Sequence, residues 1–308
     1  MRGEASVASA PPHKASVTAG GIAGSARRIA VVAGLTFREA WQRKMIIAAV
    51  VMSAGYLALY GLALHFASRD LAVSGHAATP AFMENVMAAQ LLYVGLFPAS
   101  LIVGLTAVFA SVAAISSELD TGLLHGVLVR PIRRTELLVG KTLGIGLMLA
   151  LHNLAFMSAL IGLALWLIEA PVANVPTALA LLTLAPLALL GLAMLGTTRL
   201  PTLANGVLCA AAYGISFVGG FIEQIGSAIR NETMVNLGII SSLLLPADAM
   251  YRKAIEYLLP GGLLLLGGGG GSILTPAESP SAWMVIYAAA YPVILIAIGA
   301  RLFAKRDL

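Results

Sequence analysis

The sequence has 308 residues, of which 59% are hydrophobic and 11% are charged, and its mean hydropathy is +0.92. A soluble globular domain is about one quarter charged, so a single water-soluble core of this size could not hide so much apolar surface. The composition excludes a soluble enzyme, a disordered chain and a disulfide-rich secreted domain, and it indicates a polytopic membrane protein. The single cysteine, Cys209, can form no internal disulfide.

Six stretches without Asp, Glu, Lys or Arg are long enough to cross about 30 Å of hydrocarbon, which takes roughly 20 helical residues. Because lipid offers no partner for backbone polar groups, we expect each stretch to be an α-helix. The predicted fold is therefore an all-α polytopic membrane protein with six transmembrane helices. These predicted spans cover residues 45–66, 91–117, 142–168, 177–198, 200–222 and 282–300.

The distribution of positive charge predicts the orientation. If both termini lie in the cytoplasm, the inside segments hold 15 Lys and Arg and the outside segments hold 4. Cytoplasmic loops carry the excess of Lys and Arg in membrane proteins. We therefore predict a multi-pass protein of the cell membrane with both termini cytoplasmic. The excess of Lys and Arg on the cytoplasmic side explains the net charge of +5 without a nucleic-acid partner, so none is expected.

Two different segments precede the first span. Residues 1–24 are rich in Ala, Ser, Gly and Pro, a composition typical of disorder. Residues 25–44 have apolar side chains at helical spacing and predict an interfacial helix on the cytoplasmic surface, with Trp41 at headgroup level. Two roles stay open for this helix: a membrane anchor, or a contact with a partner. Its polar face includes Arg38, Glu39 and Arg43.

The six-span domain, residues 45–308, contains one long extracytoplasmic segment, 223–281. Within it, residues 234–245 are apolar but too short to span the bilayer. Residues 247–259 can form a short amphipathic helix, so a re-entrant or surface-lying pair of helices is expected. Five glycines, 267–271, indicate a flexible loop.

The cytoplasmic loop between the second and third predicted spans can form a short helix of its own. Asp120 or Thr121 can cap this helix. Arg130-Pro131 ends it, because proline disfavours helical geometry in the residue before it. Two interpretations stay open: the helix rests on lipid, or it inserts into a partner protein, where a push would move both attached spans. Its broad apolar face consists of Leu123, Leu124, Val127 and Leu128.

This loop resembles the cytoplasmic loop of type-2 ABC transporter permeases, the membrane subunits of ATP-driven exporters. That family has a glutamate at the end of span two, Ser/Thr-Gly, a leucine-rich short helix, Pro-x-x-Arg, and Gly-Lys opening span three. Residues 36–44 and the link 196–199 also resemble parts of the family, so the resemblance covers about residues 27–306. The matching loop residues are Glu118, Thr121-Gly122, Leu123-Leu124, Pro131, Arg134 and Gly140-Lys141.

The resemblance implies a permease that catalyses no covalent change itself. Its loop helix would be a coupling helix seated on a separate cytoplasmic ABC ATPase, which would bind ATP and Mg²⁺, and this chain would need no cofactor. A second permease chain, expected to be a copy of this one, would complete a dimer in the lipid bilayer. Two departures from the family are Leu123, where many members have Thr or Ser, and the glycine-rich outside segment. The residues implied in coupling are Glu118, Asp120, Thr121, Gly122, Leu123, Leu124, Val127, Arg130, Pro131 and Arg134.

Polar residues inside the predicted spans are candidates for a function, because they are costly in lipid. In the family, spans two and five are expected to flank the central pathway. The alternative is that such side chains form hydrogen bonds between helices, which we favour for His152 and Asn153 of span three. The candidate pathway residues on spans two and five are Tyr93, Ser100, Thr106, Asn205 and Tyr213.

Other functions are compatible with parts of the sequence. A secondary transporter or channel would work without an ATPase, but charged residues typical of ion relays are absent from the six predicted spans. An intramembrane serine protease has Ser216 and His152 as candidates by residue type alone. Gly140-Lys141-Thr142 mimics the end of a phosphate-binding loop, but position 135 is threonine where that loop requires glycine. The residues do not specify a substrate.

Overall fold

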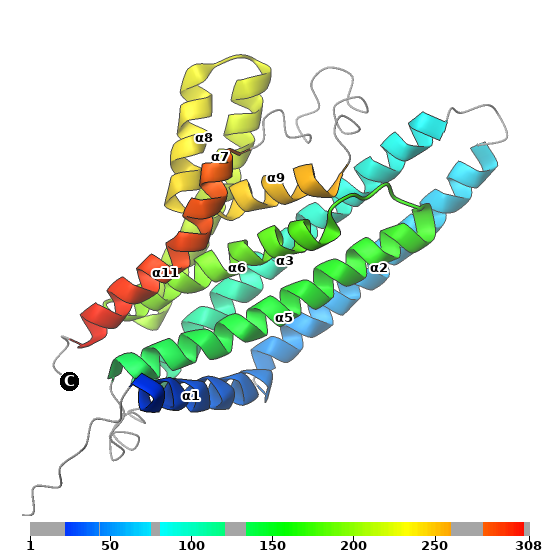
Figure 1. Ribbon diagram of the computed structural model, residues 1–308. Coiled ribbons are helices and arrows are strands. Elements are labelled where there is room, and N and C mark those ends of the chain that lie inside the picture. Colours follow the sequence, from blue (N-terminus) through cyan, green and yellow to red (C-terminus); the bar gives the residue numbers. More distant parts are fainter. Residues whose placement is uncertain (1–21, 43, 75–80, 121–133, 260–279, 305–308) are drawn as a thin grey trace, which may run out of the picture.

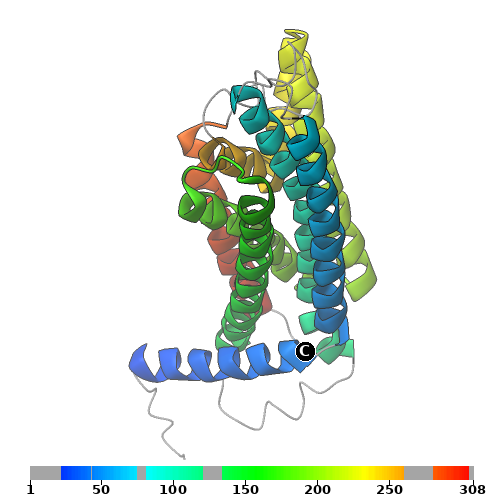
Figure 2. The same ribbon diagram turned by 90° about the vertical axis from the view of Figure 1, so that its right-hand side faces the viewer.

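The computed structural model describes residues 22–42, 44–74, 81–120, 134–259 and 280–304. These residues form α-helices joined by short connections, and none of them lies in a β-strand. Within these described ranges, six helices are long and apolar enough to cross a membrane, as the sequence predicts. The six run along broadly the same axis, whereas the first helix of the chain and one short helix near its end, both described below, lie across them (Figures 1 and 2).

Each of the six long helices overlaps one predicted span. Several extend past the predicted limits, because a helix satisfies its own backbone hydrogen bonds and can continue through polar residues beyond the hydrocarbon. The third helix along the chain, for example, begins at Ala81, well before residue 91. The six are α2 (Lys44–Ser74), α3 (Ala81–Asp120), α5 (Arg134–Ile168), α6 (Val175–Thr197), α7 (Thr202–Ala228) and α11 (Ala282–Ala304).

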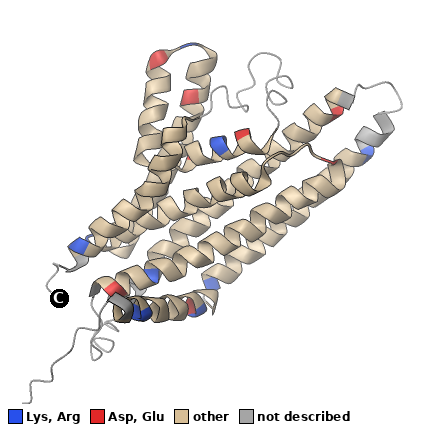
Figure 3. Ribbon diagram, viewed as in Figure 1, with Lys and Arg blue, Asp and Glu red and all other residues tan. Residues whose placement is uncertain are grey.

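The charged residues divide the molecule into two polar ends and an uncharged middle (Figure 3). Large apolar side chains on the outside of this middle region are exposed, including Leu59 at 69% and Val293 at 65%. Soluble proteins rarely expose apolar surface over such an area. The arrangement fits a bundle surrounded by hydrocarbon, with its charges at the two membrane surfaces.

A separate helix, α1 (Ile22–Gln42), precedes the first span and crosses one end of the bundle (Figure 2). It begins at Ile22, a few residues before the predicted start. Val32, Thr36 and Ala40 recur every four residues and form its buried stripe, which packs mainly against α5. Trp41 lies outside this stripe and is 60% exposed.

At the opposite end of the bundle, two short helices lie between α7 and α11 (Figure 1). They are α8 (Glu232–Leu244), which runs back beside α7, and α9 (Ala247–Leu258), which packs across α6. Their axes differ by 103°. The bend falls at Pro246, which has no N–H and keeps Leu245 in an extended conformation (φ −147°, ψ 112°). The predicted pair of short helices is confirmed, and glycines 267–271 lie outside the described residues.

Candidate functional site

The predicted coupling residues lie mostly outside the described part of the chain. Glu118 and Asp120 are in the last turn of α3, and Arg134 is the first residue of α5. Both of these helix ends lie at the end of the molecule that carries α1 (Figure 2). The residues outside the described ranges are Thr121, Gly122, Leu123, Leu124, Val127, Arg130 and Pro131, together with Arg43 of the predicted interfacial helix.

A carboxylate at the start of α5 holds α1 in place. Glu136, whose side chain is 5% exposed, accepts hydrogen bonds from Nε and Nη2 of Arg28, both at 2.8 Å. It also accepts a hydrogen bond from Oγ of Ser25 at 2.6 Å. The hydrogen bond to Glu136 raises the pKa of Arg28 above its ordinary value, and two parallel N–H bonds to one carboxylate fix the orientation of both groups. The start of α5 and α1 are therefore joined directly beside the predicted coupling segment.

Two glycines of α5 allow this close approach. A Cβ atom at Gly144 would lie 2.6 Å from the carbonyl oxygen of Ala33, and one at Gly140 would lie 2.7 Å from Cβ of Val32. Residues four apart share one helix face, and such pairs of small residues are typical of close helix contacts. Gly140 was singled out in the sequence only as part of the Gly-Lys motif. The spacing to Gly144 is the signal that could have identified the contact with α1.

Two of the candidate pathway residues meet between α3 and α7. Oη of Tyr213 donates a hydrogen bond to the carbonyl oxygen of Ser100 at 3.0 Å. Gly104, one turn further along α3, leaves space for the phenol ring, because a Cβ atom there would overlap it. Ser100 and Tyr213 also line a small cavity of about 20 Å³, together with Asp248 and Tyr251 of α9. This cavity is large enough for about one water molecule.

The polar residues Asn205 and Thr106 lie apart from that cavity. The buried Asn205 donates from Nδ2 to the carbonyl oxygen of Ala193 on α6 at 2.9 Å, and its Oδ1 lies 3.6 Å from Sγ of Cys209. Thr106 donates to the carbonyl oxygen of Ile102 in its own helix. These contacts favour helix packing over a pathway role for Asn205. The five candidates therefore do not form one cluster.

The polar residues of α5 contact neighbouring helices. Asn153 donates from Nδ2 to Oγ1 of Thr183 on α6 at 3.0 Å. Nε2 of His152 lies 3.3 Å from Oγ of Ser53 on α2. Both contacts agree with the packing interpretation that the sequence favoured for these residues.

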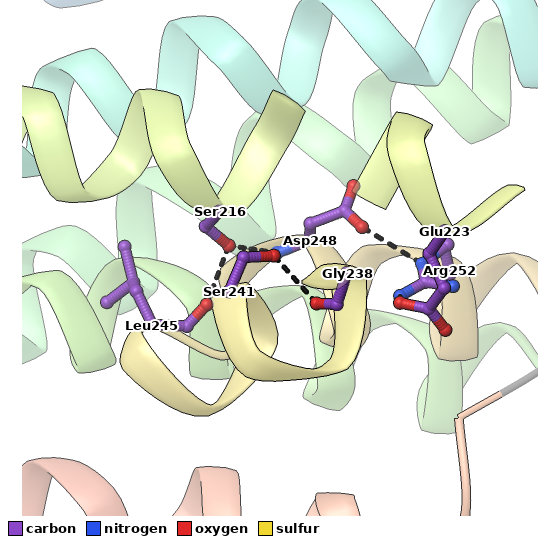
Figure 4. Close-up of polar contacts among 7 residues, drawn as sticks. All are labelled: Ser216, Glu223, Gly238, Ser241, Leu245, Asp248 and Arg252. Carbon is purple, nitrogen blue, oxygen red and sulfur yellow. Dashed lines mark hydrogen bonds and ion pairs between the residues drawn. The ribbon is translucent and has the colours of Figure 1, made fainter. Parts of the chain in front are cut away.

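A buried ion cluster on α9 was not predicted from the sequence. Arg252, which is 2% exposed, donates from Nε to Asp248 at 2.9 Å and from Nη2 to Glu223 of α7 at 2.7 Å (Figure 4). Tyr93 of α3 packs nearby, its ring centroid 6.2 Å from that of Tyr251. A buried charge is tolerated only when it is paired, so the cluster ties α9 to α7. The four-residue spacing of Asp248 and Arg252 was the available signal.

Within the described residues, no group of three or more His, Cys, Asp or Glu could hold a metal ion. The sequence of residues 30–308 matches the family described as ABC-2 family transporter protein. The chain belongs to the ABC-2 transporter family. It is a multi-pass membrane permease component of an ABC (ATP-binding cassette) transporter. A search of curated proteins gives no match.

At the bend between α8 and α9, three backbone carbonyl groups have no hydrogen-bond donor from a following turn of helix. Oγ of Ser216 on α7 donates to the carbonyl oxygen of Leu245 at 2.6 Å (Figure 4). Two tyrosines of α11, Tyr287 and Tyr291, donate to the carbonyl oxygens of Leu243 and Leu244. In lipid such groups need protein partners, so α7 and α11 hold the bend from two sides. Ser216, considered above as a protease nucleophile, has a structural hydrogen bond here, while His152 contacts Ser53.

Proposed function

We propose that this permease is the membrane subunit of an ATP-driven exporter and that the segment 118–134 is the coupling site for a separate cytoplasmic ATPase. Family membership supports the proposal most directly, because residues 30–308 match a family of ABC transporter membrane proteins. ATP and Mg²⁺ would be bound by the partner, and this chain would change shape without covalent chemistry.

The contacts at one end of the bundle support a route for the coupling force. The proposed coupling segment joins the end of α3 to the start of α5. Glu136, in the first turn of α5, holds Arg28 of α1 at 2.8 Å. A displacement of the segment would therefore act on two spans and on α1 together. Closure of the ATPase subunits would shift the permease between inward-open and outward-open states, because binding energy at one site biases a two-state equilibrium.

The α3–α7 contact is the proposed part of the pathway that moves. Tyr213 and Ser100 join these two spans through a side chain to backbone hydrogen bond. A second permease chain, which we take to be a copy of this one, would place two such pairs on either side of a central path. In this arrangement, the small cavity beside Tyr213 in each chain would open toward the central path only when α3 and α7 separate.

The test is affinity purification of the tagged permease from its native membranes in mild detergent, followed by mass spectrometry. We expect an ABC ATPase in stoichiometric amount, lost from the Leu124→Asp variant. Leu200→Asp, in the short link between α6 and α7, is the matched control because it adds the same charge elsewhere and should retain the ATPase. A clean permease oligomer without ATPase, under conditions that preserve other ABC complexes, would favour a transporter that works without one.

A further inference from the structure

A large apolar groove lies between α1, α2 and α5, with a volume of about 930 Å³. This volume is at the upper end of the range of about 300–1,000 Å³ found for small-molecule sites. Its walls are apolar side chains of two membrane spans, including Val50 and Leu57 of α2 and Met148, Leu151 and Phe156 of α5. The groove exists because α1 packs mainly against α5 and touches α2 much less.

The groove is polar at one end and apolar along its length. Its α1 side presents Arg38, Trp41 and Gln42, all of them exposed. Further along, Ser53 and His152 are the polar residues of the walls, and they contact each other at 3.3 Å. Arg38 is the one residue with a permanent charge among the described residues that line the groove. A ligand that fits this pattern has one anionic group and a hydrocarbon chain.

We propose that the groove binds an anionic phospholipid of the membrane leaflet that α1 borders. The phosphate lies at Arg38, beside the indole of Trp41, and one acyl chain runs between α2 and α5. Tryptophan is enriched at headgroup level. Helix α1 crosses the bundle at the ends of these two spans (Figure 2), and the ends of membrane spans are the level at which headgroups are expected. The lipid occupies the space between α1 and α2 that the chain itself leaves open.

The headgroup rather than the chain must select the lipid. Within a bilayer, an acyl chain gains little by exchanging lipid neighbours for leucine-like walls, because both are equally apolar. Positive side chains near the membrane surface attract anionic headgroups. Selectivity for phosphatidylglycerol over phosphatidylcholine therefore depends on Arg38. This inference does not rest on coupling to an ATPase.

The test is native mass spectrometry of the full permease in detergent, with added phosphatidylglycerol or phosphatidylcholine of identical chains. We expect phosphatidylglycerol to be retained in preference. Arg38→Glu lowers its retention about fivefold or more and removes the preference, since one surface cation contributes roughly that factor. Ala155→Trp, in the groove wall, lowers the retention of both lipids.

Two matched controls keep the result interpretable. Arg199→Glu reverses an exposed charge in the α6–α7 link, and Val293→Trp adds an indole on the outer face of α11. Both should retain lipid as the wild type does. If Arg38→Glu and Ala155→Trp, with unchanged melting temperatures, also retain it, the proposal is wrong. The competing occupant of the groove is a second copy of the chain. In that case Ala155→Trp would release monomers without loss of lipid. This result would also overturn the proposal.

Discussion

Single side chains determine how the helices of this permease pack against one another, and different kinds of residue have this role at the two ends of the bundle. At the α1 end, absent side chains matter, because Gly140 and Gly144 bring the backbones of α1 and α5 together. At the opposite end, a charged side chain matters, because Arg252 joins two carboxylates from different helices. An added side-chain atom should therefore weaken the contact between α1 and α5, and loss of the arginine charge should weaken the contact between α9 and α7.

Gly144→Ala should loosen α1 from α5. The added Cβ would lie 2.6 Å from the carbonyl oxygen of Ala33, a backbone atom that cannot rotate away. Overpacking destabilises a fold by about 1–3 kcal/mol, whereas the higher helix propensity of alanine stabilises a helix by about 1 kcal/mol relative to glycine. Because the first effect is the larger, we expect a lower melting temperature in detergent. Gly162→Ala is the control on the same helix, because nothing lies within 4 Å of its Cβ position. It should melt at or above the wild-type temperature, and equal effects of the two variants would contradict the proposed contact.

Arg252→Met should destabilise the permease strongly. It leaves Asp248 and Glu223 without their shared cation, and removal of one partner of a buried ion pair costs about 3–5 kcal/mol. Lys253→Met is the neighbouring control: the lysine side chain is also buried, at 10% exposed, but its partner Glu256 is 45% exposed and keeps water as a partner, so this change should cost less than Arg252→Met. The measurement is thermal melting in detergent.

A second variant separates charge from packing at this cluster. When Asp248→Asn and Glu223→Gln accompany Arg252→Met, no uncompensated charge remains, and part of the lost stability should return. No recovery in the triple variant would mean that the shape of the arginine, rather than its charge, holds α9 to α7.

At the scale of elements, the bend between α8 and α9 interrupts the backbone hydrogen bonding of a helix. A straight helix would satisfy the carbonyl groups of Leu243, Leu244 and Leu245 by itself. Here Pro246 interrupts the helix, and side chains of α7 and α11 supply the donors instead. The short helices are therefore held by their neighbours, so their position depends on where α7 and α11 stand.

The double variant Tyr287→Phe/Tyr291→Phe should loosen the bend. Each change removes a hydroxyl donor from a backbone carbonyl and keeps the ring, at a cost of about 1 kcal/mol per hydrogen bond. Hydrogen–deuterium exchange should become faster at the backbone amides around residues 241–250. Tyr257→Phe, on α9, is the control, because its ring contact with Lys253 is retained. Unchanged exchange in the double variant would show that Ser216 alone suffices.

At the scale of the whole molecule, the sequence predicted the elements well and their contacts poorly. A span needs only an uncharged stretch of sufficient length, so the six helices could be found without knowing their neighbours. Pro246 marked the break between α8 and α9 for the same local reason. The ion pair of Arg28 with Glu136 joins residues 108 positions apart, and that of Arg252 with Glu223 joins different helices. Such pairings depend on which helix faces meet, and local spacing does not specify that.

The orientation of the whole bundle can be tested by labelling cysteines with a membrane-impermeant maleimide. The native Cys209 is fully buried and should give little background. We expect Glu232→Cys, at the exposed start of α8, to react in intact cells, because the excess of Lys and Arg predicts that the other end is cytoplasmic. Arg199→Cys, in the α6–α7 link, should react only after permeabilisation.

A third position distinguishes six spans from seven. The pair α8 and α9 could count as one broken span by length and composition, in which case the end of α11 would lie outside the cell. Because α8 runs back beside α7 and α9 turns by 103° to lie across α6, we expect the pair to return to the side from which it came. Arg301→Cys should therefore react only after permeabilisation, like Arg199→Cys. Reaction of Arg301→Cys in intact cells would establish a seventh crossing and place the C-terminus outside.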